Sequence, residues 1–318
     1  MRKILAYACA IILGLGLILS GCAGRTKGKN ENLPEKQKQA TDDPYSMQVT
    51  VRIPGAQAGP QVNNAMKLLF EYAKAGKLED ARKIYDSMAA MGDSQAIKEV
   101  RAGAAMNLIS AYVKTIELDK AREIYDSIPA PGDSQVIKKV RAMTGAILIS
   151  AYATKAVQPD KARDIYDAMS ALGDAEDVAQ WRVFAATNLI LAYANTGKPG
   201  EARTIYDSMP APDDSQTVRQ WRAVAAANLI LAYVNAGKFG EARTIYDSMP
   251  AMGDSEGIKM PRAMAAVTLI SAYARIGKPD EARKIYGTMA GLGDSADVKQ
   301  YRDEAANLIK KLDGKGHP

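Results

Sequence analysis

The stretch Glu201-Ala-Arg-Thr-Ile-Tyr-Asp-Ser-Met-Pro-Ala211 recurs without a substitution at residues 241–251, and looser copies occur four more times. The shared core Ala-Arg-x-Ile-Tyr begins at residues 81, 121, 162, 202, 242 and 282, in steps of 40 or 41 residues. A fixed period of this length is typical of solenoids and other helical arrays. The chain is therefore expected to be a repeat protein, a class that usually offers a binding surface rather than a catalytic pocket.

Each repeat predicts two antiparallel helices. In the fifth copy Asp214 and Ser215 offer N-cap oxygens, and apolar residues then recur at helical spacing up to Tyr233. Gly237 suits the left-handed conformation that ends a helix, and a second apolar stripe follows from Ala242. A linker of about four residues makes the two helices antiparallel neighbours. One such hairpin cannot offset the entropy of ordering its own residues, so the hairpins must stack.

The pattern divides the chain into four segments. Residues 1–21 read as a signal peptide, residues 22–60 as a flexible polar tether, and residues 61–292 as six hairpins. Residues 293–318 hold a lone helix, whose Lys310 and Lys311 suit an outward-facing cap, and a short tail. The predicted fold is thus an all-α solenoid of about six antiparallel helical hairpins with a C-terminal capping helix.

The amino-acid sequence of the repeat resembles the tetratricopeptide and pentatricopeptide families. The resemblance lies in Asn228-Leu-Ile-Leu-Ala-Tyr-Val-Asn-Ala-Gly237 followed by Glu241-Ala-Arg-Thr-Ile-Tyr-Asp-Ser-Met-Pro250, and its Leu-Ile and Met-Pro favour the pentatricopeptide family. The period exceeds the families' value of about 34 or 35 through about five added residues ahead of Arg222. These residues predict a longer first helix or a short extra turn, with a break or a kink at Pro261.

The amino terminus has the features of an export signal. Arg2 and Lys3 precede an apolar run over residues 4–19, as in a secretory signal peptide. Leu19-Ser-Gly-Cys22 closely resembles the bacterial lipobox, which implies cleavage before Cys22 and lipidation of its sulfur, with palmitate among the acyl chains. Ala23 stands where an aspartate would favour inner-membrane retention, so the resemblance implies the outer membrane if the cell has one. The alternative is an uncleaved anchor helix, for which the run is slightly short.

Between this leader and the repeats, Met47-Gln-Val-Thr-Val-Arg-Ile53 alternates like a short strand. It has no partner strand in the sequence, so we expect an extended segment that lies on the first repeat.

The composition of this chain argues against a catalytic function. The formal charge of +6 falls to +4 without Arg2 and Lys3, which is too mild to imply nucleic acid. The two cysteines, Cys9 and Cys22, lie in the leader and at its end, and the one histidine, His317, is next to the last residue. We therefore expect no catalytic residue, metal site, cofactor or small-molecule substrate. A glycan-processing accessory enzyme, the remaining enzymatic hypothesis, would need a catalytic constellation that the sequence lacks.

Tyrosine and arginine recur at fixed repeat positions. Twelve of the 15 tyrosines fall on the predicted apolar stripes, which indicates packing. Arg222 lies only about 20° from its stripe at 3.6 residues per turn, so it is expected to face the second helix, with backbone carbonyls or Asp207 and Asp247 as partners. A basic ladder for an anionic polymer or an acidic protein is the alternative. The structural arginine ladder comprises Arg101, Arg141, Arg182, Arg222, Arg262 and Arg302.

Partner contacts are expected mainly on the first helices, where the copies vary more. The position before Leu-Ile helps to select an RNA base in pentatricopeptide proteins, although Lys67 and Ile147 break the series of Asn and Thr here. Trp181 and Trp221 share one repeat position and are expected to fill gaps between repeats or to bind a peptide. The candidates at the position before Leu-Ile are Asn107, Asn188, Asn228 and Thr268.

Together these features predict a lipid-anchored, extracytoplasmic repeat scaffold that binds protein or peptide partners at the bacterial envelope. The membrane contact would run through lipid on Cys22. The alternative is a pentatricopeptide-like RNA-binding array, which would need a cytoplasmic pool of the protein, so no nucleic acid partner is expected.

Overall fold

The computed structural model describes residues 59–129, 132, 134–173, 175–209, 215–249 and 253–313. The predicted leader, Cys22, the tether up to residue 58 and the extended segment at residues 47–53 lie outside these residues. The described part comprises the predicted repeats and the C-terminal helix.

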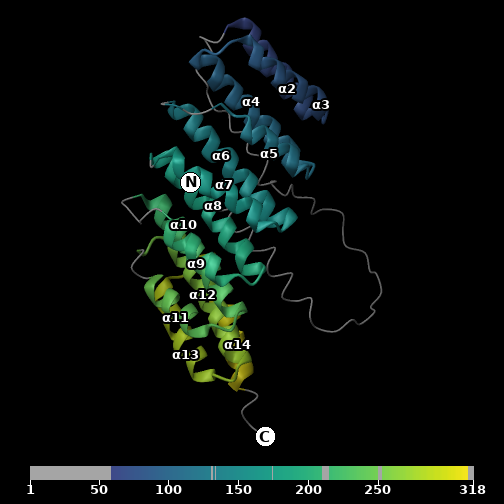
Figure 1. Ribbon diagram of the computed structural model, residues 1–318. Helices are drawn as coiled ribbons and strands as arrows, with labels where there is room; N and C mark the ends of the chain where they lie inside the picture. The colour runs from purple at the N-terminus through teal and green to yellow at the C-terminus, as the bar shows by residue number, and fades with distance from the viewer. Residues whose placement is uncertain are drawn as a thin grey trace, which may run out of the picture. The chain divides into compact units, whose positions relative to one another are not determined.

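Thirteen α-helices and no strand make up the described residues (Figure 1). A first helix, named A, and a second helix, named B, alternate to form six hairpins, named repeats 1 to 6, before one last A helix. The A helices are α2 (Pro60–Lys74), α4 (Gln95–Lys114), α6 (Gln135–Ala151), α8 (Glu176–Asn195), α10 (Gln216–Asn235), α12 (Glu256–Arg275) and α14 (Ala296–Asp313). The B helices are α3 (Leu78–Ser87), α5 (Leu118–Asp126), α7 (Pro159–Met169), α9 (Pro199–Ser208), α11 (Phe239–Ser248) and α13 (Pro279–Thr288).

Neighbouring repeats stack in chain order. Each A helix packs against the B helix of its own repeat and against the A helix of the next repeat, from α2 with α4 to α12 with α14. Each B helix also packs against the following A helix, and α14 covers α12 and α13 at the end of the array. The predicted all-α solenoid of six hairpins with a capping helix is confirmed.

The core consists of the apolar stripes that the period predicts. The first alanine of every Ala-Arg-x-Ile-Tyr core is fully buried, as are Leu229 and Ile230 on the facing A helix of repeat 5. Ten of the twelve stripe tyrosines are buried. The two exceptions, Tyr72 and Tyr286, belong to repeats 1 and 6 and are partly exposed, because the first and last hairpins are covered less completely.

The residues added to the period lengthen the A helix. The helices α4, α8, α10 and α12 are each 20 residues long and uninterrupted. Of the break or kink expected at Pro261, the break is wrong, because α12 continues through this residue. Pro261 lies in the second turn of α12, where it removes one backbone hydrogen bond.

The turn between helices A and B ends the A helix in the same way in five of the six repeats. Gly237 has a φ of 72°, and the Lys238 amide donates to the Tyr233 carbonyl oxygen at 2.8 Å, as in a Schellman motif. Ile116 and Val157 occupy the glycine position in repeats 2 and 3, with φ of 64° and 51°. A left-handed conformation costs a non-glycine residue about 1–3 kcal/mol. Repeat 3 also contains a π-helical turn, η3 (Tyr152–Ala156), which takes up the one extra residue of the 41-residue step.

Candidate binding surfaces of the array

Three of the ladder arginines turn inward and cap the preceding B helix. The guanidinium groups of Arg141 and Arg222 donate to the carbonyl oxygens of Ile128 and Met209, at 2.8 and 3.1 Å. Arg302 repeats this contact with the Met289 carbonyl oxygen at 3.4 Å. Each acceptor lies at or just past the C-terminal end of a B helix, where carbonyls lack a helical partner and a cation is favoured.

The same arginines lie over the tyrosines of the B helices. The guanidinium carbon of Arg222 is 4.9 Å from the ring centroid of Tyr206, and Arg141 lies 5.2 Å from Tyr125. Arg101 extends the series at 5.8 Å from Tyr85. Burial raises the pKa of the Tyr206 phenol against the opposing effect of Arg222, so the ring remains neutral. These contacts hold the arginines between repeats and do not form a basic surface.

The aspartates that the sequence suggested as arginine partners are engaged elsewhere. Asp207 and Asp247 each accept from the arginine four residues earlier, Arg203 and Arg243, at 2.7 to 2.8 Å. Residues four apart lie on one face of a helix, so this pairing needs no reach between helices. Loop aspartates take the role instead, since Asp294 accepts from Arg302 at 2.7 Å.

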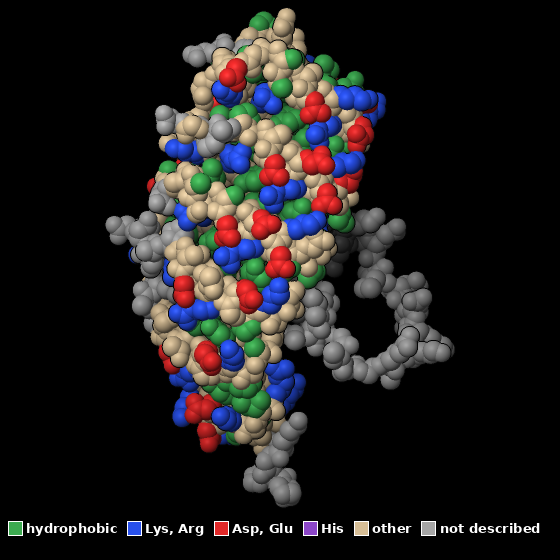
Figure 2. Space-filling model, viewed as in Figure 1, with side chains coloured by type: hydrophobic (Ala, Val, Ile, Leu, Met, Phe, Trp, Pro, Cys, Tyr) green, Lys and Arg blue, Asp and Glu red, His purple; other side chains and the backbone are tan. Residues whose placement is uncertain are grey.

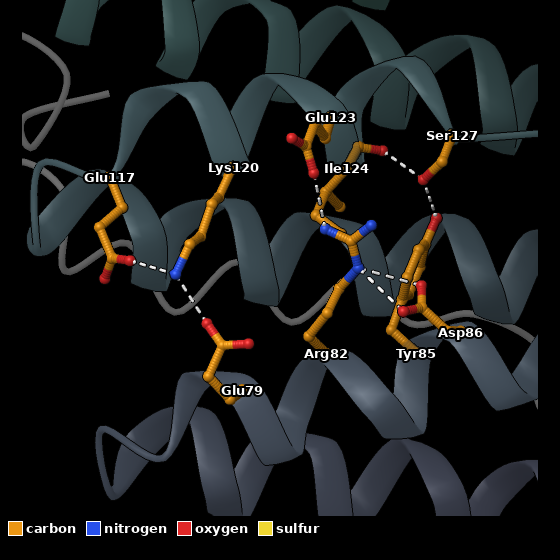
Figure 3. Close-up of polar contacts among 9 residues, drawn as sticks. All are labelled: Glu79, Arg82, Tyr85, Asp86, Glu117, Lys120, Glu123, Ile124 and Ser127. Carbon is orange, nitrogen blue, oxygen red and sulfur yellow. Dashed lines mark hydrogen bonds and ion pairs between the residues drawn. The ribbon is translucent and has the colours of Figure 1, made fainter.

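The outer face of the B helices carries paired charges. Between α3 and α5, Lys120 lies between Glu79 and Glu117, at 2.7 and 2.8 Å (Figure 3). Arg82 joins Asp86 of its own helix at 3.0 Å and Glu123 of the next at 3.3 Å. Figure 2 shows acidic and basic side chains interspersed along one face of the array. A surface that neutralises its own charge offers little attraction to a polyanion.

This pattern continues along the array. Lys161 pairs with Asp119 at 2.7 Å, and Lys198 pairs with Asp160 at 3.2 Å. Hydroxyl groups add contacts between successive B helices, from Tyr85 to Ser127 at 3.0 Å, from Tyr166 to Ser208 at 3.3 Å and from Tyr246 to Thr288 at 2.6 Å. The polar residues of the B motif therefore join one repeat to the next.

Because the B-face ion pairs are exposed, each is expected to contribute little stability. Asp207→Asn should change the free energy of unfolding by no more than about 0.5 kcal/mol, which is the usual value for an exposed pair four residues apart. Urea denaturation monitored by circular dichroism checks this expectation. A loss above about 1.5 kcal/mol would show that the pair stabilises the junction between repeats.

The candidate residues before Leu-Ile do not form a series of exposed side chains that could contact successive RNA bases. Asn188 and Asn228 are buried, with 3% and 6% of their surface exposed. The Asn188 amide donates to the Phe184 carbonyl oxygen of its own helix at 3.1 Å, and the Asn228 amide donates to the Thr187 carbonyl oxygen of the preceding A helix at 3.2 Å. The A helices pack closely enough to enclose this position in repeats 4 and 5.

The other two members of this series are partly exposed. The Asn107 amide donates to the Gly103 carbonyl oxygen at 3.3 Å, and the Thr268 hydroxyl donates to the Met264 carbonyl oxygen at 3.1 Å, each within its own helix. Only these two leave surface for a partner.

The two tryptophans belong to one aromatic cluster between repeats 4 and 5. Phe184 lies edge-on to both rings, with centroids 6.0 Å from Trp181 and 4.9 Å from Trp221. Trp221 is buried and Trp181 is partly exposed, so the cluster fills the junction of α8 and α10 and leaves one indole at the surface. The sequence pattern did not single out Phe184, although it follows Trp181 by three residues and so shares its helix face.

The described residues form neither a metal site nor a membrane-spanning helix. No group of three or more His, Cys, Asp or Glu side chains there is arranged to hold a metal ion. None of the described helices combines the length and apolar composition that a bilayer crossing requires.

Comparison with known families matches part of this array. A family model described as PPR repeat matches residues 67–93, 184–211, 227–254 and 267–294. These segments fall in repeats 1, 4, 5 and 6, whose A–B turns all contain glycine at the left-handed position. No match was found among curated proteins or among solved structures. The chain is a helical repeat protein, and four of its segments are similar to the PPR repeat.

Proposed function

We propose that this chain is a lipid-anchored, extracytoplasmic scaffold that binds protein or peptide partners at the bacterial envelope. The observation that carries the proposal is a stacked helical array preceded by the sequence Leu19-Ser-Gly-Cys22. A stacked array offers an extended binding surface. The proposal assigns the chain no catalytic activity, no cofactor and no small-molecule substrate.

The arrangement of polar side chains supports a protein partner over RNA. A PPR-like RNA reader needs accessible polar side chains at successive repeats and a positive surface for phosphates. Here Asn188 and Asn228 are buried, the ladder arginines contact carbonyls and tyrosine rings, and the B-face charges are paired. Trp181 and Asn107 remain accessible on A helices, and a partly exposed tryptophan is a frequent anchor for peptides.

Lipidation is tested by metabolic labelling. Labelled palmitate should enter the wild-type protein, and Cys22→Ala should abolish the labelling because the acceptor sulfur is gone. Cys9→Ala is the matched control, since Cys9 lies inside the predicted leader and is removed with it. Equal labelling of wild type and Cys22→Ala would contradict a lipid on Cys22. Several acyl chains on one cysteine would anchor the protein far more stably than one chain.

The class of partner is tested by crosslinking in intact cells. A photoreactive residue at position 107 or 181 should crosslink to a protein, because these positions are accessible on A helices. The same residue at position 201, on the outer face of a B helix, is the comparison position and should crosslink less. Recovery of RNA from positions 107 and 181 would reverse the ranking in favour of the RNA-binding alternative.

A further inference from the structure

Two neighbouring turns of the array depart from the pattern of the other four. The left-handed residue between helices A and B is a glycine in repeats 1, 4, 5 and 6, with φ of 70° to 73°. Repeats 2 and 3 place Ile116 and Val157 there. A β-branched residue at positive φ is a genuine outlier, because its branched side chain crowds the backbone in this conformation.

The two side chains give the fold nothing in return for this strain. Ile116 is 60% exposed and Val157 is 53% exposed, so neither contributes to the core. The turn closes equally well with glycine, since the amide that closes the helix end donates at 2.9 Å in repeat 2 and at 2.8 Å in repeat 5. Strain of this kind that persists without a structural benefit points to a role in function.

The two turns are joined to each other. Repeat 3 reaches its turn through the π-helical segment Tyr152–Ala156, a type of turn that is frequent at functional sites. Within it, the Lys155 ammonium group donates to the Val113 carbonyl oxygen, near the end of α4, at 3.0 Å. Ile116 and Val157 therefore sit in neighbouring turns tied together by Lys155. We name residues 114–117 and 154–158 the aliphatic turns.

The charges around the aliphatic turns favour an anionic partner. Three acidic side chains beside the turns are paired, with Glu79 and Glu117 on Lys120 and Asp119 on Lys161, while Glu71 on α2 and Asp164 on α7 are exposed. Three exposed lysines accompany the turns of repeats 1 and 2, and none of them forms an ion pair with a described residue: Lys74, Lys77 and Lys114.

Exposed aliphatic tips flanked by unpaired cations suit the surface of an anionic bilayer. The aliphatic side chains gain by leaving water at the boundary of headgroups and acyl chains, and the lysines are attracted by the negative headgroups. Such a surface needs no pocket for Ile116 or Val157. Acidic side chains on the neighbouring B faces, such as Asp119, are already neutralised by lysines of the array, such as Lys161.

The position of the aliphatic turns along the chain agrees with such a contact. Residues 23–58 separate Cys22 from Gly59, and 36 residues span at most about 120–130 Å when fully extended. Repeats 2 and 3 belong to the half of the array that follows this segment most closely. A bilayer that holds Cys22 is therefore within reach of both turns.

We propose that the aliphatic turns rest on an anionic lipid surface, with Ile116 and Val157 entering the boundary between headgroups and acyl chains. Lys74, Lys77 and Lys114 bind the headgroups beside them. The contact rests on the proposed envelope location, and it orients the array so that the A-helix surface remains open to a protein partner. It does not depend on acylation of Cys22.

Vesicle binding tests this proposal on the chain from Ala23 to Pro318, which lacks leader and lipid. The compact unit from Arg52 to Pro318 contains the whole described core, so the shortened chain retains the array. Cosedimentation should be stronger with phosphatidylcholine vesicles containing phosphatidylglycerol than with phosphatidylcholine alone, and it should weaken as salt rises. Replacing both Ile116→Gly and Val157→Gly should weaken binding about tenfold or more, because two aliphatic side chains are lost.

Stability measurements separate this role from a structural one. The double glycine variant should unfold at an equal or higher urea concentration than wild type, since glycine relieves the strain at positive φ. Leu68→Gln is the matched control, because Leu68 is an exposed apolar residue on α2 outside the aliphatic turns, and it should bind vesicles like wild type.

Several outcomes would overturn the proposal. It fails if wild type does not bind the anionic vesicles, if the glycine variant binds them like wild type, or if that variant loses stability. It also fails if a photoreactive residue at position 116 crosslinks in cells to a protein and not to lipid. Because the vesicle assay uses an unlipidated chain, a negative result leaves the palmitate experiment on Cys22 unaffected, and the reverse also holds.

Discussion

Tyr206→Ala is expected to lower the free energy of unfolding by about 3–5 kcal/mol, the usual loss when a large aromatic side chain is removed from a core. Tyr206 is 7% exposed and lies under the guanidinium group of Arg222. Alanine would leave a cavity at the junction of repeats 4 and 5 and would remove the ring from beneath the cation. Urea denaturation followed by circular dichroism measures the loss.

The array supplies its own control for this substitution. Tyr286 occupies the same repeat position in α13 but is partly exposed, so Tyr286→Ala should cost clearly less than Tyr206→Ala. If Tyr206→Ala cost less than about 0.5 kcal/mol, the side chain would be facing a partner and not the core.

Arg222→Met is expected to cost about 2–3 kcal/mol, because it keeps much of the aliphatic stem and removes the charge. The Met209 carbonyl oxygen then loses its donor, and the Tyr206 ring loses the cation above it. The same denaturation experiment measures this loss. Arg203→Met, which breaks only an exposed pair on the B face, is the comparison variant and should cost no more than about 0.5 kcal/mol.

The two substitutions should also be coupled. Arg222 and Tyr206 are in direct contact, so the double variant is expected to lose less stability than the sum of the two single losses, by about 0.5 kcal/mol or more. Additive losses would mean that the contact between guanidinium and ring contributes nothing, and that each residue stabilises the array through other neighbours.

The fold could be predicted from the sequence because one local pattern determines it. The 40-residue period and the helical spacing of alanine, leucine, isoleucine and tyrosine specify which faces are buried, and stacking follows from the short turns. The inward direction of Arg222 also follows from its angular offset on the helix. These features depend on geometry within one hairpin, which a sequence reports directly.

The features that the sequence did not predict depend on how side chains of one helix contact another helix. An aspartate of the B helix was an equally reasonable arginine partner, and only side-chain placement shows that Asp207 pairs with Arg203 while Arg222 donates to a carbonyl oxygen. The break expected at Pro261 was wrong because the cost of a proline depends on where in the helix it lies, and Pro261 lies in the second turn of α12. Burial of Asn228 likewise depends on how closely two A helices approach.

The strained turns were visible in the sequence, but their conformation was not. Ile116 and Val157 stand where four other repeats have glycine, which is a departure that a comparison between repeats detects. Two outcomes were open, since either the turn could change shape to accommodate the side chain or the side chain could adopt the glycine conformation. The structure shows the second.

The way Arg222 joins repeat 5 to repeat 4 has a consequence for the history of the chain. Arg141, Arg222 and Arg302 each donate to a carbonyl oxygen at the end of the B helix immediately before it. A copy with such an arginine therefore supplies a cation to the preceding copy, and its own B helix offers a carbonyl acceptor to the following one. A recombination event that inserts or removes a whole copy of this kind therefore leaves such a junction with both its cation and its acceptor. Length is the property that such an array can change most freely, and the identical stretches at residues 201–211 and 241–251 are what a recent gain of one copy would leave.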